Sequence, residues 1–184
     1  MGMNIETWNM KTLVIGLGNP ILGDDGVGWK VAQEVQRVVE TDARYFMPIR
    51  PLGTKTVQHV SPIEVDCVAL GGLSLMERMV GYDRAILVDS IETGQNPIGS
   101  VKVFALEELP NPSASHSTAA HDTSLLTALE VGRKMKMQVP HSVMVVTIES
   151  KNVYDFSEEL SAPVATAVPV ACEAVLELLE KEPA

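Results

Sequence analysis

Residues 13–28 read LVIGLGNPILGDDGVG, and this stretch decides how the chain is expected to fold. An apolar run ends in glycines, and two adjacent acids, Asp24 and Asp25, follow between further glycines. Residues 12–17 are short, apolar and β-branched, which predicts a buried strand. Valines then recur near the 3.6-residue period, which predicts an amphipathic helix from 27 to about 40. The two acids therefore stand where a strand turns into a helix.

Strands and helices are predicted to alternate along the rest of the chain. Apolar runs predict further strands, and apolar spacing near 3.6 predicts further helices. The predicted strands are 63–70, 84–90, 100–106 and 142–148, and the predicted helices are 73–80, 125–137 and 164–179. Residues 42–62 are too long for a simple crossover and stay unassigned. The alternation predicts a three-layer α/β fold, a mostly parallel twisted sheet with helices on both faces, of the phosphorylase/hydrolase-like kind.

Composition narrows the class of protein. The chain has 184 residues, which predicts a single domain over 1–184, with residues 1–10 expected to be flexible. The net charge is −10 and no Lys/Arg cluster occurs, which argues against a nucleic-acid partner. We find no apolar run of transmembrane length and no secretory signal, so we expect no membrane partner and a cytoplasmic location. The sequence leaves the oligomeric state open.

The two cysteines are not expected to react or to bind a metal. Cys67 and Cys172 lie far apart, form no CxxC pair and stand in apolar surroundings. Buried free thiols are expected rather than a disulfide or a zinc site. Motifs of other hydrolases and of nucleotide-binding proteins are missing too, namely GxSxG, HExxH, the Walker A loop and the GxGxxG dinucleotide fingerprint.

Acidic residues follow two of the predicted strands. In open α/β sheets, ligands collect at the carboxyl ends of the strands. Asp24 and Asp25 follow the first strand, and Asp89 ends the apolar run RAILVDS. Each acid has a second interpretation, because aspartates also form turns and cap helices.

Histidine adds a possible third group. Two of the four histidines, His116 and His121, lie in SASHSTAAHDTSLLTALE, a loop of small residues that leads into a helix. A loop histidine is often merely exposed, but binding sites are built from such loops. Two carboxylates and one imidazole would suit a borderline divalent ion such as nickel, zinc or cobalt.

Four stretches together resemble the hydrogenase maturation proteases, the endopeptidases that trim the C-terminus of NiFe-hydrogenase large subunits. They are GLGNPILGDDGVG, GGLSLMERMVGYDRAILVDSI, SHSTAAHDTSLLTALEVG and TIESKNVYDFSEELSAPVATAVP. They occur in the family's order and span nearly the whole chain after about Lys11.

The resemblance implies a catalytic and metal-contacting set of Asp25, Asp89 and His121. Asp25 corresponds to the family's second acidic position, and Asp24 is then expected to shape the turn or cap the helix. His116 is the alternative to His121. The implied partner is a NiFe-hydrogenase large-subunit precursor, and the implied metal is nickel carried by that precursor and not held tightly by the free enzyme. Attack by water is favoured, because no Ser or Cys stands as an obvious nucleophile.

One departure and two alternatives accompany this interpretation. Leu70 stands where many family members have an Asp before the GG pair, so partner recognition is expected to differ. A non-enzymatic nickel-binding maturation chaperone would need the same three ligands. VIGLGNP also resembles peptidyl-tRNA hydrolases, but the chain lacks their TRHN-like histidine segment and a basic surface.

Overall fold

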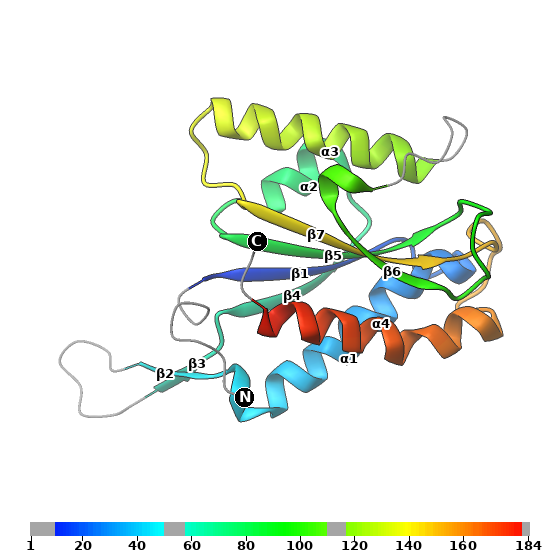
Figure 1. Ribbon diagram of the computed structural model, residues 1–184, viewed down its shortest axis with the longest axis horizontal. Helices are drawn as coiled ribbons and strands as arrows, with labels where there is room; N and C mark the ends of the chain where they lie inside the picture. Colours follow the sequence, from blue (N-terminus) through cyan, green and yellow to red (C-terminus); the bar gives the residue numbers. More distant parts are fainter. Residues whose placement is uncertain (1–9, 50–57, 110–116, 182–184) are drawn as a thin grey trace.

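The fold is built around one central sheet (Figure 1). The computed structural model describes residues 10–49, 58–109 and 117–181, and the backbone alone for 47–49, 58–60 and 117–124. The central sheet has five strands in the order β4-β1-β5-β7-β6. Their bounds are β1 Thr12–Leu17, β4 Ile63–Val68, β5 Arg84–Ile91, β6 Val101–Ala105 and β7 Ser142–Glu149. Four strands run parallel and β6 runs antiparallel to β7 at one edge.

Helices cover both faces of this sheet (Figure 1). Helices α1 (Val27–Thr41) and α4 (Ala162–Glu180) lie on one face, and α2 (Gly72–Arg78) and α3 (Ser117–Lys134) lie on the other. Each face has its own apolar core, one shared with α1 and α4 and the other with α2 and α3. The predicted three-layer α/β fold is confirmed.

The sequence pattern of the inner elements explains their burial. All six residues of β1 are buried, and so are seven of the eight residues of β5. Parallel strands covered on both faces need apolar side chains in both directions, which produces continuous rather than alternating apolar runs. In α1, Val31 and Val35 are fully buried, as the spacing of the valines predicts.

Two glycines let α1 begin directly against the sheet. A Cβ on Gly16, in β1, would collide with the backbone carbonyl of Gly28, in the first turn of α1. A Cβ on Gly28 would meet the carbonyl oxygens of Leu17 and Val88. Both positions therefore need glycine, and their close contact fixes where the turn between β1 and α1 can lie.

The largest differences from the sequence prediction are at residues 42–62 and at the start of α3. Part of the unassigned stretch 42–62 forms a two-stranded antiparallel sheet, with β2 at Met47–Ile49 and β3 at Gln58–Val60. Helix α3 begins at Ser117, eight residues before the predicted start at 125. Its first two turns contain small and polar residues, which give no apolar period to detect.

Helix α4 corrects one expectation about length. Its 19 residues have a mean hydropathy of 1.6 in the most apolar window, so this helix could cross a membrane by length and composition alone. From the sequence we expect no apolar run of transmembrane length, and α4 is such a run. In the fold, Val164, Ala171 and Val175 of α4 are fully buried in the core that it shares with α1.

Residues 1–10 are expected to be flexible, but residues 1–9 lie outside the described residues.

Candidate active site

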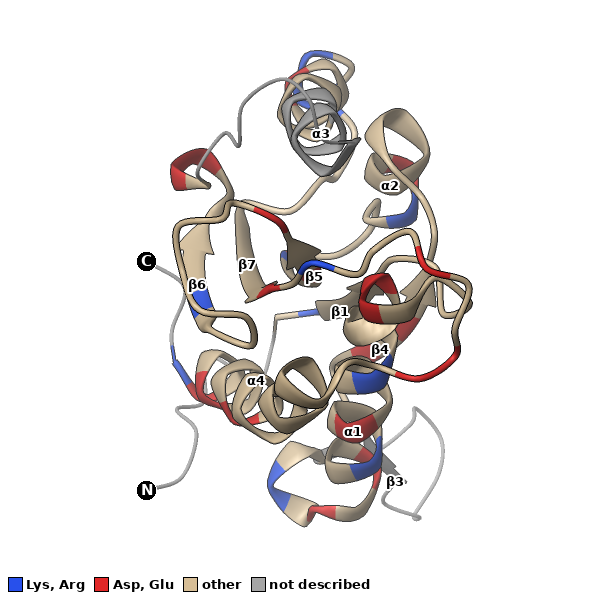
Figure 2. Cartoon of the chain, turned by 90° about the vertical axis from the view of Figure 1, so that its right-hand side faces the viewer, with Lys and Arg blue, Asp and Glu red and all other residues tan. Residues whose placement is uncertain are grey.

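The candidate site lies at the edge of the sheet where the four parallel strands end, here called the carboxyl edge. Figure 2 looks onto this edge, and acidic segments lie around the ends of β1, β5 and β7. Loops at this edge connect β1 to α1, β4 to α2, and β7 to α4. Ligand sites of open α/β sheets are built at such an edge.

The two adjacent acids lie in a short 3₁₀ turn, Gly23–Gly26, between β1 and α1. Gly18 and Gly23 both have positive φ, 115° and 55°, which lets the chain reverse twice over a few residues. A Cβ on Gly18 would collide with the backbone carbonyl of Asp25. The turn is therefore folded tightly against the end of β1, and its two carboxylates have little freedom to move.

Asp25 is half-buried and is held by neutral donors. The backbone N–H of Asn19 donates to its Oδ2 at 2.6 Å, and the hydroxyl of Ser90 donates to its Oδ1 at 3.3 Å. Ser90 follows Asp89 directly in β5. The hydroxyl contact therefore brings the carboxylate of Asp25 to the end of the strand that carries the second candidate acid.

Asp24 is fully buried, and its carboxylate contacts the connection between β7 and α4. Its carboxylate accepts hydrogen bonds from the backbone N–H of Ser161 at 2.7 Å, the Ser161 hydroxyl at 2.9 Å and the backbone N–H of Asn152 at 3.4 Å. Neither the 3₁₀ turn nor α1 has a side-chain cap. The expectation that Asp24 caps the helix is wrong, because the carboxylate instead anchors the loop between β7 and α4.

Asp89 is half-buried near the end of β5. It lies two residues after Leu87, whose side chain belongs to the core under α2 and α3, so strand alternation directs Asp89 to the same face. Its register partner in β7 is Thr147. Asp25, in the turn after β1, and Asp89, near the end of the neighbouring strand β5, therefore lie at the same edge of the sheet.

Of the two candidate histidines, the structure describes only the backbone of His121. His121 lies in the second turn of α3, and α3 begins at the end of the molecule where the parallel strands end (Figure 1). Its side chain is outside those that the structure describes, and His116 lies outside the described residues altogether. Among the described side chains, no group of three His, Cys, Asp or Glu could hold a metal ion. The three-ligand set therefore stays a prediction.

A small cavity with both polar and apolar walls lies at the ends of β5 and β7. Its volume is about 110 Å³, and Thr147, the register partner of Asp89, contributes to its wall together with Ile91, Lys102, Phe104 and Glu149. Glu149 is buried, and its carboxylate accepts from the N–H groups of Thr93 and Gly94 at 2.8 Å each. These bonds fix the loop after β5 and with it one wall of the cavity.

No cysteine is suited to act as a nucleophile in the described part of the chain. Cys67 and Cys172 are both free, which confirms the expected absence of a disulfide between them. Burial raises the pKa of both thiols, so the thiolate form is suppressed near neutral pH. Cys67 is half-buried rather than buried, which slightly corrects the sequence interpretation.

The residues that hold the two acids were not identified from the sequence. Ser90 and Ser161 are 65 and 137 positions away from the carboxylates that they contact. Neither belongs to a motif that marks such a contact. The only sequence signal was that Ser90 follows a strand-end acid and that Ser161 precedes an apolar helix.

Several solved structures with the same fold are hydrogenase maturation enzymes. The hydrogenase maturating endopeptidase HybD from Escherichia coli superposes with a TM-score of 0.66, at 20% identity, over 92% of each chain. The NiFe-hydrogenase maturation protease HybD from Thermococcus kodakarensis gives 0.60, at 22% identity, over 94% of this chain and 100% of the other. At these identities the likeness establishes the shared fold.

Sequence comparison identifies the family. The hydrogenase expression/formation protein HupD of Rhizobium leguminosarum bv. viciae is 24% identical over 169 residues, which are 92% of this chain and 74% of HupD. The family model of the hydrogenase maturation proteases (HycI) matches residues 63–178, which is more than half of the chain. The chain therefore belongs to the hydrogenase maturation protease family and is an endopeptidase of hydrogenase maturation.

Proposed function

We propose that this endopeptidase removes the C-terminal peptide of a NiFe-hydrogenase large-subunit precursor after nickel has been inserted into that precursor. In this proposal Asp25, Asp89 and His121 contact the nickel that the precursor carries. The enzyme keeps no nickel of its own, so a precursor without nickel lacks the group that would hold its cleavage site at the carboxyl edge.

The observation that carries the proposal is the arrangement of the two acids. The Ser90 hydroxyl and the Asn19 N–H hold the carboxylate of Asp25 beside the end of β5, where Asp89 lies. Both are half-buried, so each keeps part of its surface for a ligand. Two carboxylates and an imidazole form a donor set that suits nickel while leaving coordination positions for the precursor's own ligands.

The chemistry assigned to these residues is hydrolysis by water. The nickel anchors the precursor so that the scissile peptide bond lies at the carboxyl edge. A carboxylate accepts a proton as water attacks the carbonyl carbon, and the proton then passes to the leaving nitrogen as the C–N bond breaks. The suppressed thiolates of Cys67 and Cys172 support this route over a covalent intermediate.

Mass spectrometry of the precursor tests the proposal. Nickel-loaded and nickel-free precursor are incubated with the wild type and with Asp25→Ala, Asp89→Ala and His121→Ala. His116→Ala is the matched control for the histidine assignment. We expect the wild type and the control to release the C-terminal peptide from the loaded precursor alone, and the other three variants to release none.

Three other results would each change the proposal. Equal cleavage of loaded and nickel-free precursor would refute nickel recognition while leaving the protease activity intact. Loss of cleavage in His116→Ala but not in His121→Ala would transfer the imidazole role to His116. Tight nickel binding by the chain alone, without any cleavage, would favour the non-enzymatic chaperone.

A further inference from the structure

The loop between β7 and α4, residues 151–160, is hydrogen-bonded to the connection between β1 and α1. The N–H of Gly23 donates to the carbonyl of Ser157 at 2.7 Å, and the N–H of Ser157 donates to the carbonyl of Ile21 at 3.1 Å. The N–H of Asp24 donates to Asn152 at 3.0 Å. With the three bonds to the buried carboxylate of Asp24, these contacts tie the loop, and Ser161 just before α4, to the turn that carries Asp25.

This loop exposes two aromatic side chains. The chain has only eight aromatic residues, and seven have a described burial. Five of these are buried or half-buried, and the two exposed ones are Tyr154 and Phe156, at 64% and 87%. Single exposed apolar residues are ordinary on protein surfaces, but two neighbouring aromatics in one loop form a patch.

Ile21 extends the patch toward the candidate site. It is 45% exposed and lies beside Phe156, because the next residue, Ser157, donates its N–H to the Ile21 carbonyl. Ile21 also lies four residues before Asp25 in the same connection between β1 and α1. The aromatic patch, defined here as Ile21, Tyr154 and Phe156, is thus continuous with the part of the carboxyl edge that carries the proposed catalytic acid.

The charges around the aromatic patch are mostly negative. Asp155, Glu158 and Glu159 are exposed in the same loop, against a single exposed cation, Lys151. Aromatic side chains surrounded by charged ones match the usual anatomy of a protein interface, with an apolar centre and a polar rim. A complementary partner would present an apolar depression bordered by Lys and Arg.

We infer that the aromatic patch is a docking surface for the hydrogenase large-subunit precursor, contacting it outside the cleavage site. The inference rests on the proposed function, because it takes the precursor as the partner. Hydrogen bonds at Asn152 and Ser157, on either side of Tyr154 and Phe156, tie this part of the loop to the turn that carries Asp25, so less loop ordering is needed on binding. Their contribution is to affinity for the precursor and not to the chemical step.

Steady-state cleavage of nickel-loaded precursor by a double variant, Tyr154→Ala/Phe156→Ala, tests this inference. We expect KM to rise by about tenfold to hundredfold, as for aromatic residues at interface centres, while kcat stays within about twofold. Tyr154→Phe/Phe156→Tyr keeps both rings and should keep the wild-type KM. Met135→Ala is the matched control, because Met135 is 67% exposed just after α3, at the opposite end of the sheet.

The outcomes separate docking from other roles. An unchanged KM in the double variant, or a fall in kcat alone, would overturn the inference. A dimeric wild type with a monomeric double variant in sedimentation would overturn it too, because a second copy of the chain would then occupy the patch. If the wild type cleaves no precursor, the proposed function fails, and the docking role is then tested by binding alone. Equal affinity of wild type and double variant for the precursor would overturn the docking role.

Discussion

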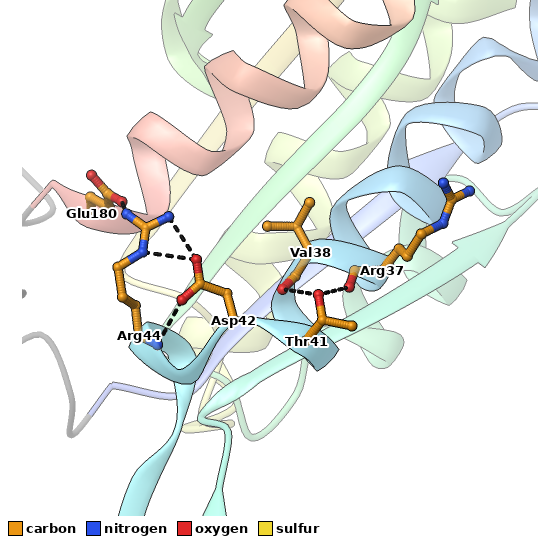
Figure 3. Close-up of polar contacts among 6 residues, drawn as sticks. All are labelled: Arg37, Val38, Thr41, Asp42, Arg44 and Glu180. Atoms are coloured by element: carbon orange, nitrogen blue, oxygen red, sulfur yellow. Dashed lines mark hydrogen bonds and ion pairs between the residues drawn. The ribbon is translucent and has the colours of Figure 1, made fainter.

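The acidic residues at the two ends of α1 have different partners: an arginine beyond the C-terminal end and neutral hydrogen-bond donors before the N-terminal end. Beyond its C-terminal end, Asp42 is paired with Arg44, whose guanidinium also contacts Glu180 at 2.7 Å (Figure 3). Before its N-terminal end, Asp24 and Asp25 accept hydrogen bonds from N–H and O–H groups, and none of the ion pairs among the described residues involves them.

The difference indicates what each end does. An arginine neutralises the carboxylate that it orients, and the exposed cluster at Asp42 serves local structure. Neutral donors orient a carboxylate without cancelling its charge. A half-buried acid held in this way stays available to a cation, which a salt-bridged acid does not. Four variants test this contrast, beginning with the one that should lose the most activity.

The largest effect is expected from removing the charge of Asp25. Asp25→Asn keeps the size of the side chain but loses the carboxylate, so we expect cleavage to fall by about 10²- to 10⁴-fold. The melting temperature should stay within a few degrees of the wild type. Mass spectrometry of the cleaved precursor and a thermal melt of the same sample check both parts. A variant with full activity would remove Asp25 from the proposed site.

Asp24 should behave in the reverse way. Asp24→Ala removes the acceptor of the half-buried Ser161 N–H and of the exposed Asn152 N–H, and we expect it to lower the free energy of unfolding by about 1–3 kcal/mol. Turnover at saturating precursor should persist below the melting temperature. Chemical denaturation measures the loss, and Asp24→Asn, which keeps one acceptor oxygen, should lose less. Equal stability of all three proteins would contradict the anchoring role.

Ser90→Ala probes the orientation of Asp25 without touching its charge. The hydroxyl lies 3.3 Å from Oδ1, so it makes a long hydrogen bond, and Asn19 still holds the other oxygen. We expect kcat to fall only a few-fold, on the order of the roughly 1 kcal/mol that one such bond contributes. Ser90→Thr retains the hydroxyl and should recover most of the activity. A loss as large as that of Asp25→Asn would mean that Ser90 itself takes part in the reaction.

The smallest effect is expected at Asp42. Hydrogen bonds from the Arg44 side chain lower the pKa of Asp42 below its usual 3.8. The contribution of the pair to stability is therefore complete above that value and is lost as the pH falls through the lowered pKa. Melting temperatures of wild type and Asp42→Asn from about pH 7 to about pH 2 should differ slightly at the upper end and converge at the lower end. High salt should reduce the difference, because the pair is exposed.

Local patterns predicted most of the fold. β1, β5 and β7 were identified because strands buried on both faces leave continuous apolar runs, and α1 because its valines mark one face. The β2–β3 pair was missed because three-residue strands, one of them with Pro48, are too short for a period to be detected. The start of α3 was missed because its first turns are small and polar.

The position of the candidate acids could be predicted from the sequence, but their hydrogen-bond partners could not. The order of strands brings Asp25 and Asp89 to one edge, and this followed from the rule for parallel sheets. The opposite roles of two adjacent acids did not follow from their spacing. They depend on Ser90 and Ser161, which become neighbours of the acids only when the sheet is assembled, so the sequence around the acids contains no trace of them.

The hydrogen bond between Asp24 and Ser161 also determines when, during translation, the acidic turn can fold. The acidic turn is made early, but its anchor lies 137 residues further along the chain. At about 5–20 residues per second, the ribosome needs on the order of ten seconds to supply that partner. Until then the carboxylate of Asp24 lacks its Ser161 donors, and the connection between β7 and α4 is not anchored to the acidic turn. The turn that carries both acids therefore cannot take its final form until the chain has been made through Ser161.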